Sequence, residues 1–383
     1  QINMQSWMFL SSYEKLRDWL LDNTTIITMA HLGGRAFDSI SGEVVSATAF
    51  VMEKIAKPNY CGVYLRLVDG KSEAEKSASL LEAAQSRECN WLYEAKPSDL
   101  IKIPGRPIAY WIDDVTYNNF ISMGAIGDIA EIKVGMHTGS NEIFVRYWHE
   151  VSFGNIQLNC KNNQESITFD AKWYPYNKGG QWRKWYGNRD LVVNWGGQGD
   201  DIHRFHGLPK DYNGAPVRAK KYQFKESITW SDIATKKFAA RYSPAGSMFD
   251  VKGSSAFMDK EKLNDVLALM CSPKIVEFME MLNPSSTFQV GDIARVPFPK
   301  HGFGSEKINS NVTKAIDISK EDHDESELSF EFRANSLVSQ KNYRSLKESF
   351  LALGKKHGDR SESLLFIERE NYSLICQDYG SLA

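Results

Sequence analysis

Residues 24–32 have the sequence Thr-Thr-Ile-Ile-Thr-Met-Ala-His-Leu, and the pair Gly33-Gly34 follows them. The run is rich in β-branched and apolar residues, which is typical of a buried strand. The glycine pair ends that strand. Two further runs of this kind, residues 44–52 and 60–68, follow without a helical pattern between them. Together they predict an α/β sheet that ends in strands without intervening helices.

The residues before this sheet predict a short strand and a helix. Residues 1–4 resemble the end of a buried strand, and apolar side chains recur at helical spacing over residues 13–20. Ser11 or Ser12 is placed to cap the helix, and Glu14 three residues after Ser11 fits a capping box. Because position 1 is not Met, we expect that an upstream part of the protein is absent from this chain.

The rest of the chain divides into three segments that differ in composition and in residue pattern. Residues 71–103 form a connector that is polar and helical in pattern up to about residue 99. Residues 104–303 alternate short strands with turns and carry aromatic side chains among Lys and Arg, with one helical interlude near residues 259–281. Residues 304–383 are predicted to be helical, with an amphipathic helix over 342–380 and an acidic, solvated surface or loop at 320–325. With residues 1–70, these segments make four predicted parts.

Composition sets limits on function. The chain has 383 residues, 42% of them hydrophobic, and a formal net charge of -2, so any basic surface must be local. The five cysteines are scattered without a C-x-x-C pair, which argues against a structural zinc site or a disulfide framework and favours the reducing cytoplasm. No apolar run has the length of a membrane span and no signal peptide opens the chain, so we expect no membrane association.

Several catalytic motifs are absent from the sequence. There is no Pro-Pro pair, no phosphate-binding loop and no nucleophile elbow, and we expect no G-x-G fingerprint on a strand-turn-helix unit. His203 and His206 follow Asp200 and Asp201, but their spacing matches no standard metal site, which favours a polar loop over a metal centre. We therefore expect the chain by itself to have no catalytic activity.

The most specific stretches of the sequence lie near its start and are Asn3–Arg17, Ile27–Phe37 and Gly42–Met52. They resemble the last third of the catalytic domain of adenine-specific DNA methyltransferases, and the similarity is greatest to the PglX family of BREX phage-defence systems. The resemblance extends over nearly the whole chain.

The resemblance implies a fold and a reaction. Residues 1–70 would be the C-terminal end of a Rossmann-like class I methyltransferase sheet, and residues 104–303 a mostly β target recognition domain, so the fold class is α/β followed by α+β. The full-length enzyme would transfer a methyl group from S-adenosylmethionine to the exocyclic amine of a flipped adenine. The Asn-Pro-Pro-Tyr motif and the cofactor site would lie upstream of this chain.

Flipping an adenine out of duplex DNA costs a few kcal/mol, which stacking on an aromatic ring partly offsets. By resemblance, Phe37 packs against the flipped base, although a loop anchor is the alternative interpretation. Gly33 and Gly34 would let the backbone approach the base closely. Arg35 would contact a phosphate or face solvent.

Two later blocks resemble DNA-contacting segments of the same family. Residues 135–141 (Gly-Met-His-Thr-Gly-Ser-Asn) match the G-x-x-T-G-x-N segment that opens target recognition domains, and a plain hairpin turn is the alternative. Residues 172–188 form a basic and aromatic hairpin with no acidic residue, which suits backbone phosphates. The predicted DNA-binding residues of these blocks are Thr138, Ser140, Asn141, Arg146, Lys172, Lys178, Gly179, Gly180, Gln181, Arg183, Lys184 and Asn188.

A fourth block, residues 238–257, also follows the family pattern and offers Arg241 as a DNA contact. Arg218, Lys220 and Lys221 precede it and are phosphate ligands or a solvated basic face. Arginine pairs with guanine, and Asn or Gln with adenine, in direct readout. The side chains chemically able to read bases include Gln181, Arg183, Asn188, Gln198 and Arg204, and they do not determine a target sequence.

The resemblance implies that double-stranded DNA and other BREX proteins are partners, and that phage DNA-mimic proteins are possible inhibitors. Three alternatives remain. The chain could be the DNA-reading half of a single-chain type II restriction-modification enzyme with an upstream nuclease. A non-enzymatic specificity subunit would not need the α/β segment 1–68. A carbohydrate-binding β protein would explain the aromatic residues but not the interleaved Lys and Arg.

Overall fold

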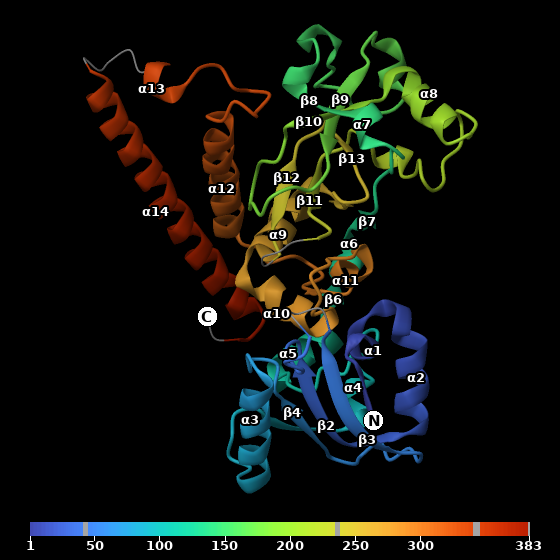
Figure 1. Ribbon diagram of the computed structural model, residues 1–383. Helices are drawn as coiled ribbons and strands as arrows, with labels where there is room; N and C mark the ends of the chain where they lie inside the picture. The colour runs from blue at the N-terminus through green and yellow to red at the C-terminus, as the bar shows by residue number, and fades with distance from the viewer. Residues whose placement is uncertain (41–44, 234–237, 340–344, 382–383) are drawn as a thin grey trace. The chain divides into compact units, whose positions relative to one another are not determined.

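A computed structural model describes residues 1–40, 45–233, 238–339 and 345–381. The chain forms two compact units (Figure 1). Unit 1 comprises residues 1–123 and 278–284, and unit 2 comprises residues 124–277 and 285–383. No helix among the described residues is both long and apolar enough to cross a lipid bilayer.

Unit 1 contains a five-stranded sheet in the order β1-β3-β2-β4-β5. Strand β2 runs parallel to β4, and the other neighbours are antiparallel. The three predicted strands are confirmed as β2, β3 and β4, although Val44 lies outside the described residues. The strands are β1 (Ile2–Met4), β2 (Thr25–Gly33), β3 (Ala47–Glu53), β4 (Gly62–Arg66) and β5 (Leu92–Ala95).

Three local predictions for unit 1 are wrong. Strand β1 is exposed rather than buried, because it pairs only with β3 at the sheet edge. No side chain caps α2, because Ser11 and Ser12 belong to a preceding 3-10 turn and Tyr13 takes the N-cap position. The stretch predicted as helical over 71–99 also contains β5. The helices of unit 1 are α1 (Ser6–Phe9), α2 (Glu14–Asn23), α3 (Glu73–Gln85), α4 (Pro97–Leu100) and α5 (Asp114–Ser122).

Two buried cations hold unit 1 together. Arg17 has no exposed surface, and its guanidinium donates to the carbonyls of Trp7, Leu10 and Gly105. Lys76 on α3 donates to the Leu32 and Leu67 carbonyls at 2.6 and 2.7 Å. Backbone oxygens therefore stabilise both charges, as buried charges require. The apolar core comprises Trp7, Met8, Phe9, Leu21, Ile26, Met29, Tyr64, Leu100, Ile108 and Tyr110.

Unit 2 is built on two four-stranded sheets, in the orders β13-β9-β10-β8 and β12-β11-β14-β7, and a two-stranded pair β15-β6. The short strands predicted for residues 104–303 are present, but helices lie among them, so this segment is a mixture of strands and helices and not mostly β. The strands are β6 (Gly124–Ala125), β7 (Glu131–Lys133), β8 (Val145–Tyr147), β9 (Trp173–Asn177), β10 (Leu191–Asn194), β11 (Ser227–Trp230), β12 (Ala240–Ser243), β13 (Met248–Phe249), β14 (Ser255–Phe257) and β15 (Pro297–Phe298).

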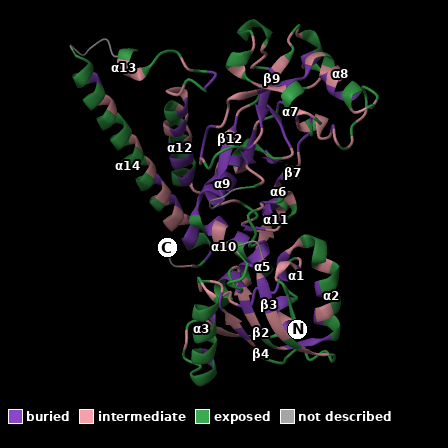
Figure 2. Cartoon of the chain, in the orientation of Figure 1, coloured by how far each residue is buried: buried purple, intermediate pink, exposed green. Residues whose placement is uncertain are grey.

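In residues 124–383, helices lie between and after the strands, and Figure 1 shows α12 and α14 side by side. The predicted helical interlude is two helices, α9 and α10, and Figure 2 shows α9 as buried. The final predicted helix is confirmed as α14. The helices are α6 (Ile126–Ile129), α7 (Asn141–Phe144), α8 (Gly196–Phe205), α9 (Lys260–Cys271), α10 (Pro273–Leu282), α11 (Val290–Ala294), α12 (Glu306–Asp324), α13 (Ser336–Ser339) and α14 (Leu346–Asp378), with short 3-10 turns at Trp148–Glu150, Phe153–Asn155, Glu165–Thr168 and Lys220–Tyr222.

The acidic stretch 320–325 is not a loop, because it forms the end of α12 and pairs with α14. Glu321 and Asp322 are exposed, which agrees with the alternative prediction of a solvated surface. Glu325 accepts from Lys356, His357 and Arg360 at 2.8 to 2.9 Å. Burial opposes ionisation of Glu325, but these hydrogen bonds outweigh it and lower its pKa to about 2. The ion pairs therefore join the two helices.

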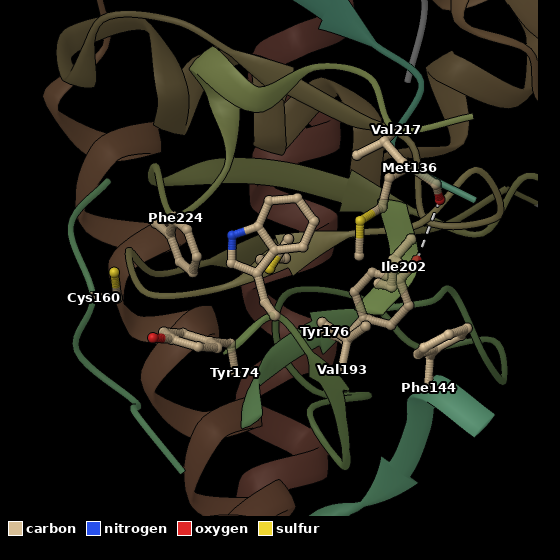
Figure 3. Close-up of a cluster of buried hydrophobic side chains, with 11 residues drawn as sticks. Met136, Phe144, Cys160, Tyr174, Tyr176, Val193, Ile202, Val217 and Phe224 are labelled. Carbon is tan, nitrogen blue, oxygen red and sulfur yellow. Dashed lines mark hydrogen bonds between the residues drawn. The ribbon is translucent and has the colours of Figure 1, made fainter. Parts of the chain in front are cut away.

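The first sheet of unit 2 carries an aromatic core (Figure 3). Trp195 packs with Tyr174, Tyr176 and Phe224, and the Tyr176 hydroxyl donates to the Met136 carbonyl at 3.2 Å. A β-carbon on Gly135 would lie 2.1 Å from the Phe249 carbonyl oxygen, so only glycine fits where this segment passes β13. Part of the Trp and Tyr content of the chain is therefore core.

Candidate nucleic-acid interface

The loop that follows β2 carries the residues predicted to shape a base pocket. Gly33 has a φ of +66° and packs against Val68, and Arg35 is exposed with a φ of +56°. The Asp38 carboxylate accepts from the Glu73 amide at 3.1 Å, which ties the loop to α3. Gly34 is half-buried, and Phe37 is 36% exposed. The Phe37 ring is therefore presented at the surface of unit 1.

An aromatic cluster that sequence reasoning did not identify lies at the same strand. His31 on β2 contacts the Tyr110 hydroxyl at 3.1 Å and the Gln5 amide oxygen at 2.8 Å. Burial lowers the pKa of His31 to about 3, with smaller contributions from Arg66 and Lys76. The Arg66 guanidinium lies 5.4 Å from the centre of the Trp111 ring, which also packs against His31. His31 is thus a neutral hydrogen-bonding residue of the core.

The G-x-x-T-G-x-N segment joins a buried network in unit 2. Thr138 is 1% exposed, and its hydroxyl donates to the Asn141 side-chain oxygen at 3.2 Å. That oxygen also accepts from Lys178 at 2.9 Å, and Lys178 forms an ion pair with Asp250 at 3.1 Å. Asp250 is buried and accepts from the Tyr176 hydroxyl at 2.6 Å. Lys178 therefore neutralises a buried carboxylate.

The predicted basic hairpin is present as β9 and β10 with a long connecting loop, and its next two cations are also paired. Arg183 forms an ion pair with Asp322 of α12. Lys184 contacts Glu368 of α14 at 2.9 Å, and the Trp185 indole donates to the same carboxylate at 2.9 Å. The two C-terminal helices therefore supply the counter-charges of this loop.

A cavity of about 380 Å³ lies between this loop, α12 and α14. Trp182, Arg183, His357 and Arg360 contribute to its lining, together with the carboxylates of Asp322 and Glu368. Two of its cations form ion pairs with these carboxylates, Arg183 with Asp322 and Lys184 with Glu368.

The other predicted DNA-binding residues of this region fall into three groups. Arg241 is 2% exposed, so the predicted contact with DNA does not fit its position. Burial also lowers the pKa of Arg241 to about 10.

Glycine and amide groups determine the conformation of the β9–β10 loop. The Asn188 side chain donates to the Gln181 carbonyl at 2.8 Å, and Gly179 and Gly180 have φ values of +81° and +113°. Arg146, Lys172, Ser140, Arg218, Lys220 and Lys221 lie at partly or fully exposed positions.

The predicted absence of a G-x-G on a strand-turn-helix unit is wrong. Gly197-Gln198-Gly199 follows β10 and lies in the first turn of α8, with all three residues at left-handed φ. Gln198 donates to the Asn163 carbonyl at 2.7 Å, and Trp195 fills the space beside Gly199. Protein side chains thus pack this turn, and no group of three or more metal-binding side chains occurs in the described part of the chain.

The fold of the chain is similar to that of a solved restriction-modification enzyme. It is similar to the type IIL restriction-modification enzyme MmeI, whose structure was solved in complex with DNA, with a TM-score of 0.53 and 9% identity. The similarity covers all of this chain and 47% of that enzyme, and at this identity it concerns the fold alone.

Sequence comparison identifies the family. The chain is 37% identical over 399 residues to adenine-specific methyltransferase PglX of Lacticaseibacillus casei strain Zhang, covering 99% of this chain and 32% of that protein. It is 39% identical over 345 residues to adenine-specific methyltransferase BrxX of Escherichia coli O9:H4 strain HS, covering 89% and 26%. No model of a known protein family matches. The chain is thus a homologue of one segment, at most a third, of the PglX and BrxX methyltransferases, and the predicted resemblance is confirmed.

Proposed function

We propose that this chain is the DNA-recognition part of an adenine-specific DNA methyltransferase that marks host DNA as self in BREX defence. The observation that supports it most is the 37% identity to PglX over 99% of the chain. The restriction-modification fold is consistent with a protein that binds duplex DNA. The methyl donor, S-adenosylmethionine, would bind to a part of the protein outside this chain.

Each unit has a role in this proposal. Unit 1 is the C-terminal end of the Rossmann-like methyltransferase sheet, and its loop after β2 receives the flipped adenine. Phe37 would stack on that base, because its ring is exposed beside a backbone that turns at Gly33. Unit 2 is the target recognition domain, whose exposed cations bind phosphates while amide side chains read base edges. Cytoplasmic BREX proteins and phage DNA mimics are proposed partners.

One rival remains, because the fold similarity is to a restriction-modification enzyme. A single-chain enzyme of that kind would also cleave DNA, with its nuclease outside this chain. Incubation of the full-length protein with unmodified plasmid would reveal cleavage, whereas the BREX assignment predicts methylation only.

Binding of the 383-residue chain to a labelled DNA duplex tests the proposal. Fluorescence anisotropy at several salt concentrations should show an affinity that falls linearly on a log-log plot, as displaced counterions require. Calorimetry with S-adenosylmethionine should show no binding. A folded chain that does not bind duplex, or that binds the methyl donor tightly one-to-one, contradicts the proposal.

A further inference from the structure

A second basic surface lies in unit 2, away from the loop that carries Arg183 and Lys184. The ammonium groups of three lysines surround the ring of Tyr222: Lys133 at 5.0 Å from the ring centre, Lys221 at 5.5 Å and Lys225 at 5.7 Å. We call this group the Tyr222 lysine cluster. Distances below about 6 Å are those of cation–π contacts, so the ring attracts all three charges.

The fold holds this cluster in place. Tyr222 ends the 3-10 turn Lys220–Tyr222, and its ring packs on Phe257 of β14 at 5.0 Å. Phe257 pairs across the sheet with Glu131 of β7. Because side chains alternate along a strand, Glu131 and Lys133 lie on the same face of β7, where both contact Tyr222. The cluster therefore consists of Lys133 on the sheet and of a turn, with Lys221, Tyr222 and Lys225, that packs on the sheet surface.

The charges of the cluster are not balanced. Glu131 is its one carboxylate within the described ranges, and hydrogen bonds from Tyr222 and Lys133 lower its pKa. Lys133 pairs with Glu131 at 3.2 Å, whereas Lys221 and Lys225 form no ion pair with any residue that the structure describes. By contrast, Lys178, Arg183 and Lys184 each face a carboxylate. Arg218 and Lys220, which precede the cluster, also form no ion pair with a described residue.

We propose that the Tyr222 lysine cluster is the principal contact of unit 2 with the phosphate backbone of duplex DNA. Three ammonium groups around one ring repel one another, and a phosphate between them converts that repulsion into attraction. The paired cations of the β9–β10 loop would first have to leave their carboxylates, which costs the ion pairs already formed. The inference rests on the proposed function and specifies where the duplex is held.

Charge removal at the two unpaired lysines tests the inference. Lys221→Gln with Lys225→Gln should weaken binding of the 383-residue chain to duplex several-fold. It should also reduce the log-log salt slope by about 0.9 for each phosphate that is no longer neutralised. Lys161→Gln with Lys314→Gln removes two exposed lysines elsewhere in unit 2 and should leave both quantities unchanged. Lys225→Gln alone should give an intermediate slope, and far-ultraviolet circular dichroism verifies that each variant is folded.

The outcomes separate this inference from the proposed function. If the unmodified chain binds duplex with a strong salt dependence and the double variant does the same, the inference is wrong and the proposed function stands. If the unmodified chain does not bind duplex, both are wrong. An equal loss of affinity in the control pair would show that net charge matters and not the cluster, and would overturn the inference.

Discussion

At the scale of single residues, a lysine in a basic stretch can either bind a phosphate or neutralise a carboxylate inside the protein. The place of Lys178 in a basic stretch predicts that it binds phosphate, yet its ammonium group contacts the buried carboxylate of Asp250. Tyr176 and Asn141 complete the network. A sequence pattern shows that cations are close together along the chain but not which carboxylates fold against them, so this pairing was not predictable.

Replacement of Lys178 by Met should destabilise unit 2. The change leaves Asp250 buried with the Tyr176 hydroxyl as its remaining side-chain donor, which should lower the free energy of unfolding by about 1–3 kcal/mol. Urea denaturation followed by tryptophan fluorescence measures this. Lys172→Met is the matched control, because Lys172 is exposed, and should have little effect. Equal stability of the two variants would show that the Asp250 pair is unimportant.

His31 should make unit 1 sensitive to mild acid. Its pKa is about 3 in the folded chain and about 6.5 when unfolded. Between these values the unfolded state binds the extra proton, so stability falls as pH decreases from 6.5 towards 3, by up to about 1.4 kcal/mol per pH unit.

The test compares unfolding at pH 7 and pH 5 in the unmodified chain and in His31→Gln. The carboxylates are the same in both chains, so their titration cancels in the comparison. The variant should lose less stability than the unmodified chain between the two pH values. An identical decrease would mean that His31 is protonated in the folded state or contributes nothing.

At the scale of elements, carboxylates of α12 and α14 stabilise the β9–β10 loop. Glu368 accepts from both Lys184 and the buried Trp185 indole, and Asp322 pairs with Arg183. The presence of α14 and of the β9–β10 hairpin was predictable from periodicity and composition. Their association was not, because Lys184 and Glu368 are distant in sequence and no local pattern connects them.

Glu368→Ala should weaken the association of α14 with the β9–β10 loop. The Trp185 indole would be left without its acceptor in a buried position, which should cost about 1–3 kcal/mol of stability. Glu362→Ala, on an exposed position of the same helix, is the control and should be nearly neutral. Thermal unfolding of the two variants provides the comparison. If both unfold at the same temperature, the C-terminal helices do not stabilise the loop.

At the scale of the whole molecule, the sequence predicted the strands and helices of unit 1, the short strands of unit 2 and the helical end of the chain. It did not predict most of the helices that lie between the strands of unit 2. The family resemblance identified the relatives. Neither the sequence pattern nor the resemblance could predict which lysines and arginines lack a carboxylate partner in the folded chain. That depends on tertiary ion pairs such as Arg183–Asp322. The Tyr222 lysine cluster illustrates this, because Lys133 and Lys225 come from different parts of the chain and meet only in the fold.

The central claim is that this segment determines which DNA site is methylated. The most direct measurement uses two chimeric proteins. In one, residues 1–383 replace the matching segment of L. casei PglX, and in the other they replace the matching segment of E. coli BrxX, so that each relative is the parent of one chimera. Long-read sequencing of host DNA then maps modified adenines. The account predicts that both chimeras modify one shared motif that differs from the motif of either parent. Chimeras that each keep the motif of their own parent would contradict it.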